Sequence, residues 1–345
     1  MSASPYRLTL SQQIAGIVHY AAARAGGYPT LVNLEVTRRC NARCDFCRYW
    51  TTQNEEALDD YLPVIRRLRP SAVVFTGGEP LMRRDLESQI RRLREAYPAM
   101  FIGLVTNGAL LTVERGMALW DAGLSQMTVS LDFLDCRHDE ARHIPRLTER
   151  IKETLPQLVA RGVNNLLVQA VIKTETIGSI PDIIEWASIA GVRVSLSAYT
   201  SAKNGNDRHC VGKGELEAVR RLVDTALRRK GNRGPVVSSA YYLGRIVEYF
   251  GGPGIAGCPA GQRFVTVDPA GNVYRCSESL DGIPFGQWSP GVFGATRCRG
   301  CWVPCRGESQ APLTWERVKQ VAEIYARRMR GQSGVPVRNP AAGVA

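Results

Sequence analysis

The residues of this chain best suited to chemistry are three cysteines in one short loop, Cys40, Cys44 and Cys47. Their Cys-x3-Cys-x2-Cys spacing brings three thiolates close enough to bind three irons of a cubane cluster. Ferredoxin clusters use four cysteines, and no fourth cysteine closes this loop. One iron would be left open for an exchangeable ligand, which indicates chemistry rather than electron storage alone. A zinc loop is the alternative, and it would need a fourth ligand nearby.

A second motif, Gly77-Gly78-Glu79-Pro80, comes directly after a predicted strand. Two glycines let the backbone approach a ligand closely and expose its peptide groups. The glutamate and the nearby carbonyls can accept hydrogen bonds from an ammonium group. Taken alone, the Gly-Gly pair is equally typical of a tight turn.

The cysteine loop and this turn together resemble the signature of the radical S-adenosylmethionine (SAM) enzymes. In that family the amino and carboxylate groups of SAM chelate the fourth iron of a [4Fe-4S] cluster, and the Gly-Gly-Glu-Pro turn contacts the SAM amino group. The resemblance implies further SAM contacts from Phe46, near the adenine, and from Asn107, Ser130 and Asp132 at later strand ends. Turn and cap chemistry is the alternative explanation for these last three.

Alternating strands and helices are predicted to position these motifs. Such alternation argues for a parallel sheet, whose ligand-binding residues lie at the C-terminal strand ends. The resemblance implies an α/β fold, namely a partial (β/α)6 radical SAM barrel with a small C-terminal cysteine-rich β-hairpin and helix module. Strands are predicted at residues 31–36, 72–75, 101–106, 126–131, 166–172 and 192–198, with helices near 54–68, 85–97, 112–121, 145–160 and 180–190.

The chain divides into five predicted segments. The C-terminal tail, residues 331–345, is rich in glycine, proline and small residues, and we expect it to be disordered. A helix is predicted just before it, at residues 314–329. The segments are an N-terminal helix (1–29), the barrel (30–205), a helix and linker (206–257), the auxiliary module (258–330) and the tail (331–345).

Five further cysteines gather in the auxiliary module. Cys276 ends a predicted hairpin, Cys258 precedes it, and Cys298, Cys301 and Cys305 follow in one loop. This pattern resembles the shortened auxiliary-cluster module, called twitch, of SPASM-type radical SAM enzymes. The resemblance implies an auxiliary [4Fe-4S] cluster on Cys258, Cys276, Cys298 and Cys301. Cys305 either replaces Cys298 as a ligand or donates a hydrogen atom to a substrate radical, as in relatives that epimerise sugars. Structural zinc is the alternative.

Composition adds broad limits. The 345 residues are 44% hydrophobic and 8% aromatic, as in ordinary globular proteins, and we expect neither a secretory signal nor a membrane span. The net charge of +12 comes largely from arginines on predicted helices, where a solvated face is the default interpretation. An acidic substrate or peripheral contact with an anionic membrane would also fit, whereas no nucleic-acid motif is present. Free thiolates predict a reducing, cytoplasmic location.

The family resemblance also implies a reaction. One electron from a low-potential donor such as flavodoxin or ferredoxin would reduce the SAM cluster, and the resulting 5'-deoxyadenosyl radical would abstract a hydrogen atom from a substrate. We expect a small molecule (a sugar, cyclitol or nucleoside-like compound) that undergoes oxidation, epimerisation or rearrangement. No leader-binding domain precedes the first strand, which ranks a ribosomal peptide lower. The absence of a C-terminal Gly-Gly likewise ranks the nucleotide rearrangement of molybdenum cofactor synthesis lower.

Two alternatives remain open at this stage. The predicted N-terminal helix, residues 10–24, carries an apolar stripe, and a hopanoid-type lipid or isoprenoid substrate at a membrane surface would suit such a helix in a basic protein. A non-enzymatic iron–sulfur protein for electron transfer would leave the Gly77–Pro80 turn without a purpose, and it predicts no SAM cleavage.

Overall fold

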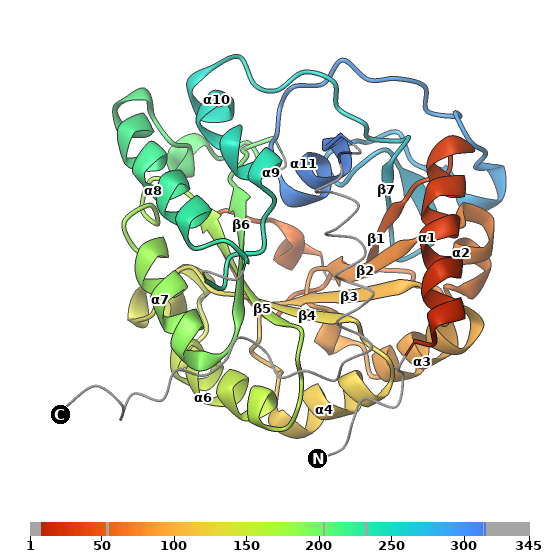
Figure 1. Cartoon of the computed structure of the whole chain (residues 1–345), viewed down its shortest axis with the longest axis horizontal. Helices are drawn as coiled ribbons and strands as arrows, with labels where there is room; N and C mark the ends of the chain where they lie inside the picture. Colours follow the sequence, from red (N-terminus) through yellow and green to blue (C-terminus); the bar gives the residue numbers. More distant parts are fainter. Residues whose placement is uncertain (1–7, 53–54, 203, 232–233, 313, 315–345) are drawn as a thin grey trace.

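The computed structural model describes residues 8–52, 55–202, 204–231, 234–312 and 314. Its centre is a nine-stranded sheet in the order β6-β5-β4-β3-β2-β1-β7-β8-β9. Strands β1 to β6 pair in parallel in sequence order, and Figure 1 shows the sheet curving with helices along its outer side. These six strands are β1 (Leu31–Thr37), β2 (Ala72–Gly77), β3 (Phe101–Thr106), β4 (Gln126–Ser130), β5 (Leu166–Ile172) and β6 (Arg193–Ala198).

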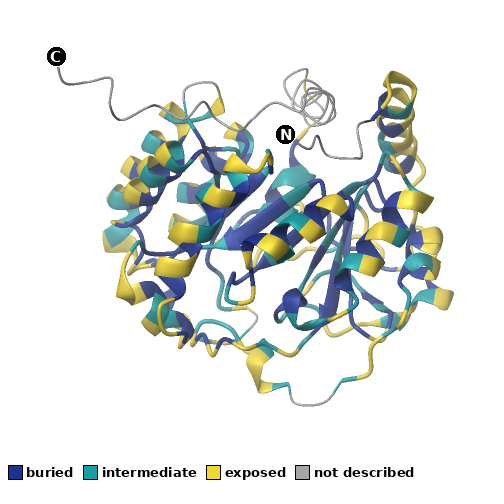
Figure 2. Ribbon diagram, turned by 90° about the horizontal axis from the view of Figure 1, so that it is seen from below, coloured by how far each residue is buried: buried dark blue, intermediate teal, exposed yellow. Residues whose placement is uncertain are grey.

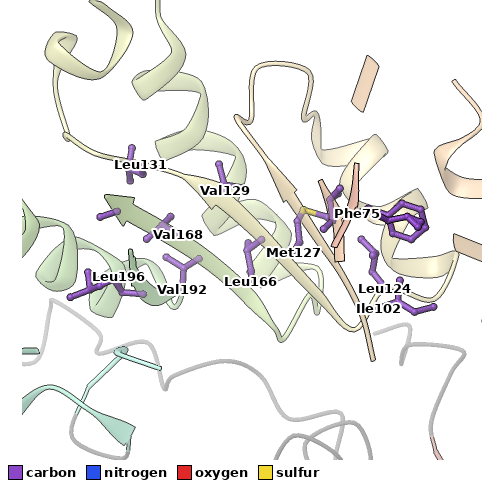
Figure 3. Packing of buried hydrophobic residues seen from close by; sticks show 14 of the residues in the cluster. Phe75, Ile102, Leu124, Met127, Val129, Leu131, Leu166, Val168, Val192 and Leu196 are labelled. Atoms are coloured by element: carbon purple, nitrogen blue, oxygen red, sulfur yellow. The ribbon is translucent and has the colours of Figure 1, made fainter. Parts of the chain in front are cut away.

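The helices that follow the strands cover the convex side of the sheet. Strand residues that face these helices, such as Val73, Phe75 and Ile102, are fully buried. Figure 3 shows this layer continuing through Met127, Val129, Val168 and Leu196, and Figure 2 shows the outer helix faces exposed. The helices are α2 (Leu62–Leu68), α3 (Leu86–Ala96), α4 (Val113–Asp121), α5 (Cys136–Arg142), α6 (Leu147–Ala160), α7 (Ile180–Ala190) and α8 (Leu216–Arg228).

The C-terminal hairpin continues the barrel sheet instead of forming a separate unit. Strand β7 (Phe264–Val267) pairs in parallel with the free edge of β1, with Leu31 opposite Phe264. Strands β8 (Asn272–Tyr274) and β9 (Ile283–Pro284) then add in antiparallel fashion. Helix α11 (Pro304–Gln310) contacts both β6 and β7 (Figure 1), so it lies across the gap between the two sides of the open barrel.

The remaining elements are shorter, apart from the N-terminal helix. Helix α1 (Leu10–Ala25) begins with a capping box between Thr9 and Gln12. Among the described residues, no helix is long and apolar enough to cross a membrane. The other elements are α9 (Ala240–Gly244), α10 (Ile246–Gly251) and the 3-10 helices Tyr49–Thr51, Pro80–Met82, Asp207–His209, Lys213–Glu215 and Phe285–Gln287.

The structure confirms the α/β fold and the open, partial barrel, and all six predicted strands are present with bounds within two residues. The helix predicted at 54–68 is wrong in its first half, because α2 begins only at Leu62. Glu55 instead accepts hydrogen bonds from the Thr37 hydroxyl and the Arg38 amide, so the segment before α2 is held against the cysteine loop. The predicted helix at 314–329 and the predicted tail lie outside the described residues, apart from Thr314.

Candidate active site

The three cysteines of the N-terminal loop lie at the C-terminal end of β1, where the fold places ligand-binding residues. Cys44 is buried, and Cys40 and Cys47 are half-buried. Burial, with smaller contributions from the neighbouring Glu79, Cys44 and Cys47, raises the pKa of Cys40 to about 11. The indole of Trp50 donates to the carbonyls of Cys44 (3.1 Å) and Cys47 (2.9 Å), which fixes the loop backbone. The three thiols therefore belong to one compact, protected site.

The backbone of the cysteine loop packs directly against the Gly77–Gly78 turn. The Gly78 amide donates to the Thr37 carbonyl at 2.7 Å, and the Glu79 amide donates to the Arg39 carbonyl at 2.9 Å. A Cβ on Gly77 would lie 2.1 Å from the Thr37 carbonyl oxygen, and one on Gly78 would lie 2.1 Å from that of Arg39. Gly77 also has a φ of +123°. Both positions need glycine because the loop backbone rests directly on the turn.

Glu79 joins the turn to the end of β3. The carboxylate is fully buried and accepts from the Thr106 hydroxyl (2.7 Å), the Asn107 amide (2.7 Å) and the Leu81 amide (3.0 Å). Burial raises the Glu79 pKa, although these hydrogen bonds oppose the shift. The Asn107 side chain donates in turn to Asn41 of the cysteine loop at 2.8 Å. Two predicted cofactor residues, Glu79 and Asn107, thus support the loop through contacts within the chain.

Asp132 is the centre of a buried ion pair beside the same loop. Its carboxylate accepts from Arg142 Nη2 at 2.8 Å and from the Val171 amide at 2.9 Å. Burial alone would raise the Asp132 pKa, but the charges of Arg142 and Lys173 hold it below its usual range. Arg142 Nη1 lies 4.0 Å from Cys44 Sγ. The sequence analysis assigned no role to Arg142, which lies on α5, a helix that Asp135 caps.

Phe46 lies between cationic and aromatic side chains. The Lys173 ammonium is 3.9 Å from the centre of its ring, and His209 packs edge to face with it at 6.0 Å. Lys173 is fully buried and pairs with Glu175 at 3.1 Å. Ser130, also predicted to contact the cofactor, is the half-buried last residue of β4. Lys173 was not found from the sequence, since one lysine after a strand carries no signal of burial.

His138 should make the fold sensitive to acid. Its Nδ1 accepts from the Asp132 amide at 3.2 Å, and burial lowers its pKa to about 3. An unfolded histidine binds a proton below about pH 6.5, whereas the folded one stays neutral there, so stability falls as the pH falls through this window. We expect urea unfolding to show a loss of about 1.4 kcal/mol between about pH 7.5 and 5.5.

Replacing His138 with glutamine should remove that difference, because the amide has no proton to gain. The exposed His143 at the end of the same helix provides the matched control. His143→Asn keeps a residue that tolerates its φ of 54° and should keep the wild-type pH dependence. An unchanged slope in His138→Gln would contradict the assignment.

The five C-terminal cysteines gather at the opposite end of the barrel. Cys258 packs with Phe264, and Cys276 and Cys305 pack against this cluster near Leu31, the first residue of β1. Burial raises the pKa of Cys276 and Cys301 to about 11. Strand β1, which runs from Leu31 to Thr37 between the two cysteine groups, is about 20 Å long.

Cys305 is half-buried, whereas Cys258 and Cys301 are buried. Burial of the thiol is the main cause that raises the pKa of Cys305, the neighbouring Cys301 and Cys276 also raise it, and a hydrogen bond with the Asn33 side chain lowers it. Asn33 belongs to the face of β1 opposite the fully buried Val32 and Leu34, which is the face toward the barrel interior. Cys298, by contrast, is exposed.

The donor chemistry of the N-terminal group fits an iron–sulfur cluster. Within the described residues, no three or more His, Cys, Asp or Glu side chains converge as ligands of a single metal ion. A cluster does not require such convergence, since each cysteine binds its own iron. Soft thiolates are also the ligands that clusters select. Three thiols that a rigid turn holds at the mouth of a barrel meet these requirements.

Comparisons with known proteins agree with this geometry. Residues 34–187 match the family model described as Radical SAM superfamily. Among curated proteins, the chain is similar to GTP 3',8-cyclase of Rhodococcus opacus (strain B4), with 31% identity over 192 residues, 51% of this chain and 52% of the relative. GTP 3',8-cyclase of Staphylococcus aureus (strain JH9) is 40% identical over 117 residues, 30% of this chain and 34% of the relative. The chain thus matches about half or less of the length of these relatives.

Solved structures share the fold at low sequence identity. Streptococcus suis SuiB bound to S-adenosylmethionine superposes with a TM-score of 0.61 and 16% identity, over 80% of this chain and 69% of that one. Native anSMEcpe with bound AdoMet gives a TM-score of 0.60 and 15% identity, over 87% of this chain and 98% of that one. The radical SAM resemblance is confirmed, whereas the auxiliary module and the site residues stay predictions. Residues 34–187 of this chain are a radical SAM superfamily domain, an enzyme domain whose cofactors are a [4Fe-4S] cluster and SAM.

Proposed function

We propose that this chain cleaves SAM to methionine and a 5'-deoxyadenosyl radical and directs that radical at a C–H bond of a small polar molecule inside the barrel. The observation that carries the proposal is the close backbone packing of the cysteine loop against the Gly77–Gly78 turn. The cluster, when bound, supplies the electron that breaks the carbon–sulfur bond of SAM. The protein's part is to hold the ligands, orient SAM and keep water away.

The surroundings of the loop suit the charged groups of SAM. Arg142 and Lys173 are buried cations close to the loop and to Phe46, and they can attract a carboxylate. The Gly77–Pro80 turn offers backbone groups to the amino group. Asp132 and Glu79 act within this scheme as positioning residues, since their carboxylates already bind donors of the chain.

The barrel interior supports a hydroxyl-rich substrate. On several strands, residues that alternate with the buried apolar layer face inward, and a number of them are polar and half-buried. Side chains of this kind recognise hydroxyl and amide groups, as in a sugar, cyclitol or nucleoside-like molecule. The relatives named GTP 3',8-cyclase support a nucleoside-like substrate. These inward positions are Asn33, Thr76, Gln126, Ser130, Gln169 and Ser195.

We further propose an auxiliary [4Fe-4S] cluster on Cys258, Cys276, Cys298 and Cys301. The clustering of these thiols at the end of the barrel opposite the SAM site supports it. The substrate would then lie between the two clusters. The contact of Cys305 with Asn33 supports a role for this thiol as a hydrogen-atom donor toward the barrel interior.

Anaerobic reconstitution tests both proposals. We expect about eight irons per chain and formation of 5'-deoxyadenosine from SAM with dithionite. In a Cys40→Ala, Cys44→Ala, Cys47→Ala triple variant, about four irons should remain and cleavage should vanish. About four irons in the wild type with cleavage retained would exclude the auxiliary cluster. Bound clusters without SAM cleavage would overturn the proposed activity in favour of electron transfer.

A further inference from the structure

Each cysteine group contains a buried arginine that faces a sulfur atom. Arg142 Nη1 lies 4.0 Å from Cys44 Sγ, and Arg306 Nη1 lies 3.9 Å from Cys301 Sγ. The two side chains are equally enclosed, with 5% of Arg142 and none of Arg306 exposed. A guanidinium carries its charge at any pH that the fold survives. Each cluster site thus has a permanent positive charge against one of its sulfur ligands.

The two arginines differ in their counter-charge. Arg142 forms an ion pair with the buried Asp132 at 2.8 Å, and the charge of Asp132 offsets part of the effect of Arg142 on the Cys44 sulfur. In the described part of the chain, no carboxylate lies within ion-pair distance of Arg306. Its nitrogens donate to the carbonyls of Cys301 (2.7 Å), Ile255 and Cys298 (3.5 Å), and Nε has no partner. Carbonyl oxygens orient a guanidinium without removing its net charge.

Two carboxylates belong to the same region, but neither neutralises Arg306. Glu308 accepts a hydrogen bond from the Ser239 amide at 2.8 Å. Glu278 is two residues from Cys276 and accepts from the Ser277 hydroxyl at 3.0 Å. Neither carboxylate forms an ion pair with Arg306, which contacts a ligand sulfur directly, although the charge of Glu278 raises the pKa of Cys276.

Burial alone does not distinguish Arg306. Arg94 is also buried, with 1% exposed, and its nitrogens donate to backbone carbonyls and to the Ser125 hydroxyl. Arg306 is set apart by its contact with sulfur, and Arg94 provides a matched control for the loss of a buried guanidinium.

A positive charge at a ligand sulfur stabilises the reduced form of a cluster, which carries one more negative charge than the oxidised form. We propose that Arg306 gives the C-terminal cluster a higher reduction potential than the cluster on Cys40, Cys44 and Cys47, where Asp132 offsets the equivalent arginine. This inference rests on the auxiliary cluster proposed above. The N-terminal cluster then keeps the low potential that SAM cleavage requires, and the C-terminal cluster accepts electrons more readily.

A potentiometric titration followed by electron paramagnetic resonance tests this inference. The parent is the full-length Cys40→Ala, Cys44→Ala, Cys47→Ala variant, in which only the C-terminal cluster can form. Arg306→Gln should shift the one-electron equilibrium at least tenfold toward the oxidised form, which lowers the midpoint by about 59 mV. Arg306→Lys keeps the charge and should retain most of the parental potential, and Arg94→Gln should leave the potential unchanged.

An unchanged midpoint in Arg306→Gln, or equal shifts in the Gln and Lys variants, would overturn the inference. A second measurement covers the case in which Arg306→Gln does not assemble. The parent is compared with a Cys258→Ala, Cys276→Ala variant, in which only the N-terminal cluster can form, and a lower or equal potential at the C-terminal cluster overturns the inference. Absence of iron in the parent would instead reject the auxiliary cluster itself and the inference with it.

Discussion

Replacing Gly78 with alanine is expected to prevent the N-terminal loop from holding its cluster. The added Cβ would lie 2.1 Å from the carbonyl oxygen of Arg39 and 2.7 Å from that of Arg38. Both are backbone atoms, so no flexible side chain can move aside and the loop itself has to shift. A loss of only 1.4 kcal/mol at the site lowers a rate about tenfold. We expect 5'-deoxyadenosine formation to fall by at least that factor, together with loss of N-terminal iron.

Gly178 supplies the control for this experiment. A Cβ at this position has no heavy atom within 4 Å, and the residue lies in the turn before α7. Gly178→Ala should therefore keep wild-type iron content and SAM cleavage. Thermal unfolding of both variants separates a local effect on the loop from general destabilisation. Wild-type cleavage by Gly78→Ala would show that the turn does not support the loop.

The parts of the site that the sequence predicted are those in which local spacing carries the chemistry. The loop from Cys40 to Cys47 brings its thiols together within a few residues of chain. The strand before Gly77 alternates between outward and inward faces, so its end could be placed from periodicity alone. The barrel could be predicted in the same way, because each βα unit buries its own apolar face and therefore carries a local apolar pattern.

The parts that the sequence did not predict depend on contacts between distant segments. Arg142 and Arg306 are single basic residues in polar stretches, and only the folded chain shows that both are buried against sulfur. Pairing of β7 with β1 joins Phe264 to Leu31, and no local pattern distinguishes this arrangement from a detached hairpin. Glu55 fits the first turn of a helix by pattern, but its carboxylate finds better donors on the cysteine loop.

Asp132→Asn is expected to destabilise the fold by about 3–5 kcal/mol, the usual effect of breaking a buried ion pair from one side. The amide can still accept from the Val171 amide, but it cannot neutralise Arg142. The Arg142 guanidinium would then remain buried without a counter-charge, because only 5% of this residue is exposed. Urea unfolding of the anaerobic protein measures the change. A second substitution, Arg142→Gln, should recover part of the loss, because it removes the uncompensated charge.

Asp135→Asn is the matched control, since Asp135 pairs with Arg137 at 2.7 Å where both side chains are about half exposed. Exposed pairs contribute about 0–1 kcal/mol, so a similar loss in both variants would contradict the role of burial.

Protonation of Asp132 at low pH should have the same effect as Asp132→Asn. Because the folded pKa of Asp132 is below its usual value, the ion pair contributes fully above about pH 3.9. That contribution disappears only as the pH falls through the lowered folded value, well below the window in which His138 acts.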